Sequence, residues 1–249
     1  MKRGAPDVNS LPTRKVDVCM ESIQFPRFPA VCVLCGETCG TDMDLCGACR
    51  SDFPSSPLRC RGCGIPLPAP GACGRCLQTP PPHHGVFCLF DYAPPLDGLI
   101  TGLKYHGRLA HARLLGELMA RRLLGEGAAR PEAIIPVPLH GRRLRERGFN
   151  QAVEIARPVA RALRLPLDPR SCRRRRATSP QSMLPAAQRS SNVRDAFAVK
   201  GAMRWRHVAI VDDVMTTGHT VDALSRCLLR HGVEKIQVWV CARAAPPAD

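Results

Sequence analysis

The chain has 249 residues, enough to bury a full core and to form one large domain or two small ones. Its hydrophobic content of 45% is typical of globular proteins, and no stretch approaches the roughly 20 apolar residues of a membrane span. The first residues carry positive charge but no apolar core of signal-peptide length, so the sequence predicts a cytoplasmic protein without membrane insertion.

Positive charge is concentrated in one part of the chain. The formal net charge is +15, and twelve arginines lie between Arg142 and Arg176, where the acidic residues are Glu146, Glu154 and Asp168. Such a block attracts polyanions, for example a pyrophosphate, a nucleotide or a nucleic-acid backbone. A solvated basic surface is the plainer alternative. Aromatic residues make up only 4% of the chain, which argues against a stacking platform for single strands.

The cysteines are the first organised feature. We expect residues 1–30 to form a flexible leader, after which residues 31–79 contain four C-x-x-C pairs. In a cytoplasmic chain, cysteines are read as thiols or metal ligands before disulfides, and two C-x-x-C turns complete a tetrahedral zinc site. The spacing therefore predicts a double zinc ribbon with two structural zinc ions. The first ligand set is Cys32, Cys35, Cys46 and Cys49, and the second is Cys60, Cys63, Cys73 and Cys76.

Alternatives to this zinc assignment stay open. One zinc ion with residual free thiols would use the same residues, and spacing alone does not prove which pairs share a metal. A redox C-x-x-C is disfavoured because no βαβ pattern surrounds the cysteines. Cys39 is spare, and His83 and His84 are candidate substitute ligands that we expect instead to lie at the surface. A zinc with all four positions filled by protein would stabilise the fold and not catalyse.

Strand and helix patterns follow the proline linker at 80–82, and we expect a second domain over residues 84–243 with a frayed tail at 244–249. Residues 86–92 and 133–137 are predicted strands. Apolar residues at helical spacing predict two helices between them, around 96–103 and 114–123.

The strand at 133–137 ends in prolines and opens onto a basic segment. Because prolines have no N–H to donate, an anion bound here would depend on the remaining amides and on guanidinium groups. The candidate residues of this segment are Val137, Pro138, Leu139, His140, Arg142 and Arg143. Residues 147–151, RGFNQ, then lead into a helix, and Pro158 predicts that this helix is kinked or confined to its first turns.

Residues 171–192 have few apolar side chains and many arginines and hydroxyls, including Arg176 and Thr178, and they predict a mobile basic loop. Two further strands are predicted, a short one at 197–199 and a last one at 236–241.

The most informative segment is residues 207–220, HVAIVDDVMTTGHT. Val208–Val211 is an apolar run typical of a buried parallel strand, and it ends in Asp212 and Asp213. The loop that follows leads into a helix, so backbone N–H groups, hydroxyls and the positive end of a helix dipole gather where a phosphate monoester would bind. The carboxylates would accept hydrogen bonds from the hydroxyls of a sugar that carries the phosphate. The candidate phosphate-binding loop is Met215, Thr216, Thr217, Gly218, His219 and Thr220. A plain strand-turn-helix with an acidic turn is the alternative.

This segment resembles the signature of type I phosphoribosyltransferases, and the whole pattern resembles the ComF family of competence-associated proteins, with GntX-like relatives. The resemblance covers roughly residues 30–243, through the cysteine ribbon, LKYHGRLA, PVPLHGRRLRERGFNQA and VDDVMTTGHT. It implies an α/β fold with a mostly parallel sheet flanked by helices, preceded by the small zinc ribbon domain. It also implies that the 215–220 loop holds the 5-phosphate of phosphoribosyl pyrophosphate (PRPP) and that Asp212 and Asp213 contact its ribose. The pyrophosphate would be held by the 137–143 segment together with Arg176 and Thr178.

The resemblance supports two functional hypotheses. One is a phosphoribosyltransferase that binds PRPP or a related ribose phosphate with Mg²⁺, uses Asp212 and Asp213 in catalysis and serves DNA uptake in natural transformation. The other is a non-catalytic protein that binds single-stranded DNA, or an adaptor for a competence helicase or recombination-loading proteins, through the basic loop and the ribbons. A third hypothesis is a regulator that binds a nucleotide and has no other activity. Too few residues follow Cys241 to cover an acceptor, so we expect residues 86–130 or the ribbon to do so.

Overall fold

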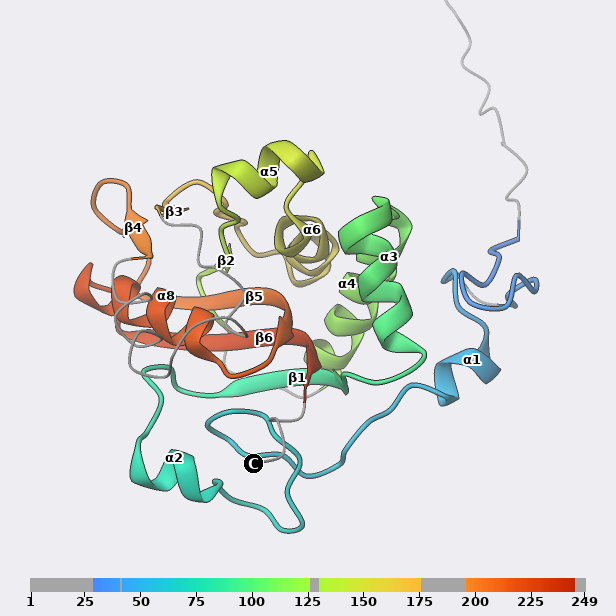
Figure 1. The fold of residues 1–249 in the computed structure, drawn as a ribbon, viewed down its shortest axis with the longest axis horizontal. Helices are drawn as coiled ribbons and strands as arrows, with labels where there is room; N and C mark the ends of the chain where they lie inside the picture. The colour runs from blue at the N-terminus through green and yellow to red at the C-terminus, as the bar shows by residue number, and fades with distance from the viewer. Residues whose placement is uncertain (1–28, 41, 126–129, 176–195, 245–249) are drawn as a thin grey trace, which may run out of the picture.

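The computed structural model describes residues 29–40, 42–125, 130–175 and 196–244. Within these residues, four parallel strands form one sheet in the order β1-β6-β5-β2 (Figure 1). They are β1 (Val86–Asp91), β2 (Ala133–Pro136), β5 (His207–Met215) and β6 (Lys235–Arg243). A separate antiparallel pair joins β3 (Cys172–Arg174) to β4 (Phe197–Val199). The strands predicted at 86–92, 133–137, 197–199 and 236–241 are thus confirmed, with ends that move by one or two residues.

Side-chain alternation along the central strands divides the interior into two apolar cores. On β5, Ala209 and Val211 belong to the first core, whereas Val208 and Ile210 belong to the second. The helices of the first core are α3 (Leu96–His106), α4 (Leu109–Gly125) and α6 (Gln151–Leu163). The helix of the second core is α8 (His219–Arg230). A parallel sheet buried on both faces explains why its strands are continuous apolar runs.

The chain leaves β2 and β5 toward opposite faces of the sheet. After β2 it passes through α5 (Gly141–Arg147) to α6 on the first face, and after β5 it passes to α8 on the second. These two strands are neighbours, paired from Ala133–Val208 to Pro136–Val211. Diverging connections open a crevice at the carboxyl ends of such strands, where open α/β sheets bind ligands.

Two sequence-based expectations about these elements are wrong. The strand that carries the acidic pair does not end at Val211, because β5 continues through both aspartates to Met215, paired with β6 along the way. Pro158 was expected to kink helix α6 or to confine it to its first turns, and the confinement is wrong, because the helix runs on to Leu163. Its close neighbour on α4 is Gly116, where a Cβ atom would lie 2.3 Å from Pro158 Cγ, so tertiary packing holds the helix around its proline.

The two zinc ribbons repeat one local structure. The N–H of Cys32 donates to the carbonyl of Glu37, and the N–H of Cys60 donates to Ile65 in the same way, each at 2.8 Å. The second C-x-x-C of each ribbon begins a single helical turn, α1 (Gly47–Ser51) or α2 (Gly74–Gln78). The glycines after Cys35 and Cys63 have positive φ angles, but those after Cys46 and Cys73 are ordinary first residues of these turns.

Each ribbon docks on a different part of the sheet domain (Figure 1). The first reaches α4 through ion pairs of Asp42 with Arg121, at 2.8 Å, and of Asp44 with Arg113. Its apolar side chains join the first core, whereas those of the second ribbon join the second core. Figure 1 shows α1 beside α3 and α4 at the right, and α2 below β1 at the lower left.

The linker after the second ribbon corrects one prediction. His84 is exposed as expected, but His83 is only 6% exposed. Its Nε2 lies 3.5 Å from Asp222 Oδ1, because the linker packs between the ribbon and α8. Across the described ranges, no helix combines the length and apolar character needed to cross a bilayer.

Candidate functional site

Asp212 and Asp213 lie near the carboxyl end of β5 and, by strand alternation, point to opposite faces of the sheet. Asp213 Oδ1 lies 3.1 Å from Lys104 Nζ on α3, and the buried Asp213 Oδ2 has no hydrogen-bond partner among the described residues. Asp212 points to the other face of the sheet, where the positive charge of Arg174 in β3 acts on it. Both carboxylates nevertheless line one cleft.

This switch-point cleft lies in the crevice between the ends of β2 and β5. Its lining residues are Lys104, Tyr105, Val137, Pro138, Leu139, Arg143, Arg147, Asn150, Gln151, Arg174, Asp212, Asp213 and Thr220. The structure therefore brings together the acidic pair and the end of the β2 segment, which are more than 70 positions apart in the sequence.

The environment of Asp212 favours its neutral form. Burial is the main cause and the charge of Asp213 adds to it, so the pKa of Asp212 rises to about 7 although Lys104 and Arg174 oppose the shift. Burial also raises the pKa of Cys241, and the charges of Asp213 and Asp212 add to this shift. A ligand that hydrogen-bonds to the ionised pair would therefore relieve an unfavourable electrostatic arrangement.

The Asp212→Asn variant should differ from the wild type in how its stability depends on pH. An aspartate in the unfolded chain titrates near about 3.9, so between about pH 4 and 7 the unfolded chain binds fewer protons than the folded one. The free energy of unfolding must then fall as the pH rises through this interval. In urea titrations, we expect the wild type to lose roughly 1–3 kcal/mol relative to Asp212→Asn between about pH 5 and 8.

The control for this measurement is Asp52→Asn, because Asp52 is exposed and lies outside the cleft. It removes one carboxylate away from the cleft and so controls for the loss of a surface charge. A difference from the wild type that is flat with pH for Asp212→Asn, or one of the opposite sign, would refute the raised pKa.

The loop between β5 and α8 turns at Gly218. Its φ angle is +85°, and a Cβ atom there would lie 2.8 Å from Met215 Cε, so only glycine fits without strain. No side chain of the described residues caps the start of α8, so its first N–H groups can donate to an anion.

The side chains of the predicted phosphate loop do not all face the same cleft. Thr220 lines the switch-point cleft. Met215, Thr217, Gly218 and His219 line a separate ribbon cleft against the second zinc ribbon, and Thr216 is exposed. The other residues of this ribbon cleft are Cys63, Arg75, Cys76, Thr79, Pro80, Pro81, His83, Asp222 and Arg226. Of the predicted loop, Thr220 is thus the residue that the lining of the switch-point cleft includes.

The basic segment after β2 divides in a similar way. Val137, Pro138, Leu139 and Arg143 line the switch-point cleft, but two predicted anion ligands have other partners. His140 Nδ1 accepts the N–H of Arg142 and caps α5, and Arg142 Nε pairs with Glu146 at 2.8 Å. Arg176 and Thr178 lie outside the described residues.

Sequence reasoning missed six cationic or polar residues of the cleft. Lys104 and Tyr105 come from the end of α3, Arg147 from the end of α5, Asn150 and Gln151 from the start of α6, and Arg174 from β3. Asn150 Nδ2 donates to the Val137 carbonyl at 3.0 Å while its Oδ1 caps α6, so it fixes the β2 segment to that helix. The motifs LKYHGRLA and RGFNQ contain all of these residues except Arg174 and were the available signals. The contacts of Asn150 explain one position of the second motif.

A ring cleft adjoins the switch-point cleft and shares Lys104, Tyr105, Arg143 and Arg147 with it. Its further lining residues are Gly107, Glu146 and Phe149. Tyr105 is 73% exposed, and the Arg147 guanidinium lies 5.8 Å from the centre of its ring. An exposed ring beside a guanidinium provides a surface on which a planar ligand can stack.

Both cysteine sets have the geometry of a four-thiolate zinc site. Within each set, Cys32 to Cys49 and Cys60 to Cys76, all four sulfurs lie within 4.8 Å of one another. Pairs across the two turns are 3.8 Å apart in the first set and 3.6 Å apart in the second. Tetrahedral zinc with bonds of about 2.3 Å requires sulfurs about 3.8 Å apart. The predicted pairing is therefore confirmed, and Cys39 lies outside the sets.

The thiol environments also fit a cation. Burial opposes ionisation of Cys32 and of Cys60, yet hydrogen bonds from backbone N–H groups outweigh it and lower the pKa of each to about 6. Neighbouring thiols raise the pKa of Cys49, and burial, followed by neighbouring thiols, raises that of Cys76. Four thiolates repel one another unless a divalent cation lies between them, and zinc supplies that charge as a structural ion.

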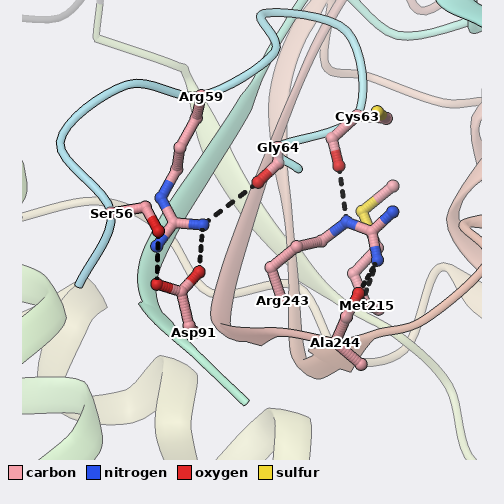
Figure 2. Close-up of polar contacts among 8 residues, drawn as sticks. All are labelled: Ser56, Arg59, Cys63, Gly64, Asp91, Met215, Arg243 and Ala244. Carbon is pink, nitrogen blue, oxygen red and sulfur yellow. Dashed lines mark hydrogen bonds and ion pairs between the residues drawn. The ribbon is translucent and has the colours of Figure 1, made fainter. Parts of the chain in front are cut away.

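The second ribbon is tied to the sheet by two arginines (Figure 2). Arg59 pairs with Asp91 at the end of β1, at 2.8 Å, and donates to the Gly64 carbonyl at 3.1 Å. Arg243, at the end of β6, donates through Nε to the Cys63 carbonyl at 2.7 Å and through Nη1 to Met215 at 3.0 Å. The ribbon therefore contacts both an edge strand and the loop after β5.

The sequence matches two family models, one described as a double zinc ribbon domain over residues 27–77 and one as a phosphoribosyl transferase domain over residues 150–248. With the parallel sheet and the two four-cysteine sites, they define the class: an α/β protein of the phosphoribosyltransferase type preceded by a double zinc ribbon.

Curated relatives narrow this class. DNA utilization protein YhgH is 39% identical in Shigella flexneri and 38% identical in Escherichia coli K12, each over 227 residues that cover 86% of this chain and 97% of the relative. Competence protein F of Haemophilus influenzae is 37% identical over 210 residues, 80% of this chain and 90% of the relative. The chain belongs to the competence protein F (ComF) family.

Among solved structures, a glutamine PRPP amidotransferase from B. subtilis is similar at 20% identity with a TM-score of 0.36. The similarity covers 52% of this chain and 25% of that one.

Proposed function

We propose that this protein binds PRPP or a related ribose 5-phosphate compound with Mg²⁺ in the switch-point cleft and transfers the phosphoribosyl group to an acceptor. The observation that carries the proposal is that an acidic pair, Thr220 in the first turn of α8 and a prolyl loop with Arg143 meet at one cleft. The match to a phosphoribosyl transferase domain supports a PRPP-like substrate. Relatives named for competence and DNA utilization support a role in the handling of incoming DNA.

Each part of the cleft has a distinct task in this reaction. Asp212 and Asp213 accept hydrogen bonds from the ribose hydroxyls and orient the sugar. The N–H groups of the 215–220 loop and Thr220 hold the 5-phosphate. Arg143 and Arg174 face the diphosphate, together with the N–H of Leu139, because Pro138 has no N–H and the Val137 N–H donates to the Val211 carbonyl. A nucleophile then forms a bond to ribose C1 as the C1–O bond breaks, and pyrophosphate leaves with the electron pair.

Mg²⁺ supplies charge neutralisation on the leaving diphosphate. The donor set is compatible with it, because Asp213 Oδ2 is a buried carboxylate oxygen without a hydrogen-bond partner in the described part of the cleft. No residue that lines the cleft is placed as a general base, so this chemistry depends on positioning and charge.

Calorimetry with PRPP and Mg²⁺ tests binding, and colorimetric pyrophosphate release with a panel of bases tests transfer. We expect saturable heat from PRPP, and competition by ribose 5-phosphate at the same site. Absence of heat with PRPP, ribose 5-phosphate and pyrophosphate would refute the proposal. Heat without pyrophosphate release would leave a ligand-binding protein and refute the transferase activity.

The ring cleft is the proposed entrance for the acceptor, since it adjoins the switch-point cleft and is lined by the end of α3 and by α5. Tyr105→Ala should weaken a stacked acceptor by about tenfold in KM while the Kd for PRPP stays unchanged, because one base–aromatic stack contributes about 1–3 kcal/mol. Tyr92→Ala is the matched control: Tyr92 is 39% exposed but lines neither cleft. Equal effects of the two variants would place the acceptor elsewhere.

A second candidate function, single-strand DNA binding, is favoured by the surface of α5. Arg142, Arg143 and Arg145 are all exposed on this short helix beside the clefts. Titration of a labelled oligonucleotide across a salt series decides: a phosphate-contacting interface loses affinity linearly in log salt, with a slope near about −0.7 per phosphate neutralised. No saturable binding at low salt would remove this function.

A further inference from the structure

The loop that begins at Met215 is held on its carbonyl side by two arginines. Arg243 is 2% exposed and donates to the carbonyls of Met215, at 3.0 Å, and of Thr216. Arg75, on the helical turn of the second ribbon, donates through Nη1 to the Thr217 carbonyl at 3.5 Å. Three consecutive carbonyls therefore turn toward the ribbon.

This orientation has a consequence for the other side of the loop. In a planar trans peptide, the N–H points opposite to the C=O of the same peptide unit. When the carbonyls of residues 215–217 turn toward the ribbon, the N–H groups of residues 216–218 turn away from it. Those N–H groups, with the uncapped start of α8, are the donors that an anion at this loop requires.

The position of the Arg243 guanidinium depends on the knuckle turn of the second ribbon, which is the turn between Cys60 and Gly64. Its Nε donates to the Cys63 carbonyl at 2.7 Å, and no carboxylate pairs with it among the described residues, so carbonyl groups satisfy this buried charge (Figure 2). The direction of the Cys63 carbonyl is set by the knuckle turn, in which Gly64 has a φ angle of +71° and its N–H donates to Cys60 at 2.8 Å. Ligation of Cys60 and Cys63 to one zinc ion holds that turn.

We infer that Arg243 is a positioning residue that couples the second zinc site to the anion-binding loop: zinc in the second ribbon orients the N–H groups of residues 216–218. Within the described ranges the first zinc site has no such connection, because its ribbon docks on α4 and on the first core. The affinity part of this inference rests on the proposed function, whereas the coupling of zinc to loop structure does not.

The two ribbons offer a matched pair of variants. Cys46 and Cys73 are equivalent ligands, each the residue before its helical turn and each partly exposed. Cys46→Ser and Cys73→Ser should each lower the zinc content from two ions to one per chain by elemental analysis. Hydrogen exchange of the peptide that covers 215–220, measured without ligand, should accelerate at least about tenfold in Cys73→Ser and less than twofold in Cys46→Ser.

Arg243→Met should accelerate exchange in the same peptide although both zinc ions stay bound. Arg243→Lys should accelerate it less than Arg243→Met, because the ammonium still donates to carbonyls on one side, but it cannot reach carbonyls on both sides. In calorimetry, Cys73→Ser and Arg243→Met should weaken PRPP by at least about tenfold, and Cys46→Ser by less than twofold. Equal loop exchange in Cys46→Ser and Cys73→Ser, or unchanged exchange in Arg243→Met, overturns the inference. Failure of the wild type to bind PRPP counts against the proposed function alone, since the exchange experiment still decides the coupling.

Discussion

Replacing Asp212 and Asp213 together with asparagine should reduce the affinity for PRPP by more than about a hundredfold and leave the protein folded. Hydrogen bonds to a charged group contribute about 1.5–3 kcal/mol each, and 1.4 kcal/mol corresponds to about tenfold in Kd. Each single variant should therefore lose at least about tenfold. Calorimetry with PRPP and Mg²⁺ measures the loss, with circular dichroism as the test of folding.

The structure gives a reason to expect that stability survives this change. Burial and the neighbouring carboxylate raise the pKa of Asp212 to about 7, so the ionised pair is unfavourable in the free protein and asparagine removes that cost. The loss of the Lys104–Asp213 ion pair, at 3.1 Å, acts in the opposite direction. A double variant that bound PRPP within threefold of the wild type would show that the ribose lies elsewhere, and Asp52→Asn controls for a general charge effect.

Removal of zinc should unfold both ribbons and lower the melting temperature of the whole chain by at least about 10 °C. Zinc binding contributes about 10–16 kcal/mol to folding in isolated zinc fingers, and about 1 kcal/mol shifts the melting temperature of a chain of this size by roughly 2–4 °C. The loss of stability extends to the sheet domain because buried residues of each ribbon belong to one of its two apolar cores. Cys32 and Phe53 are buried with α4 in the first core, and Cys60 and Cys63 are buried with α8 in the second.

A chelator titration followed by thermal melting measures this effect, and elemental analysis should find two zinc ions per chain. Cys39→Ser is the control, because Cys39 is buried in the first ribbon but lies outside the four-sulfur set. It should keep both zinc ions, whereas Cys49→Ser should keep one. A chain that melts at the same temperature without zinc would contradict the structural role of the metal.

The predictions that proved accurate concern features encoded by neighbouring residues. The four C-x-x-C pairs, the strand at 197–199 and the apolar spacing of Leu96, Leu99 and Leu103 are local patterns, and each appears in the structure where it was expected. Pro158 shows the limit of local rules. A proline predicts the end of a helix, but a close approach to Gly116 holds the helix around it.

The candidate site was predictable only in part, for a related reason. The sequence points to Asp212, Asp213 and the loop after them, but not to the split of that loop between two clefts. Lys104 and Arg174 reach the acidic pair from α3 and β3, and no spacing along the chain signals either approach. The histidine at 83 is buried because the linker packs against Asp222, more than a hundred positions away.

By itself, the sequence determined the two zinc ribbons, the α/β alternation and the acidic strand end, because thiol spacing, apolar periodicity and turn residues act over a few positions. The tertiary structure alone decided which side chains share a cleft and that Arg243 joins the second ribbon to the loop after β5. Those relations depend on how β2 and β5 diverge and on which faces of the sheet the ribbons cover. Only the folded chain sets these, because the contacting residues lie far apart in the sequence.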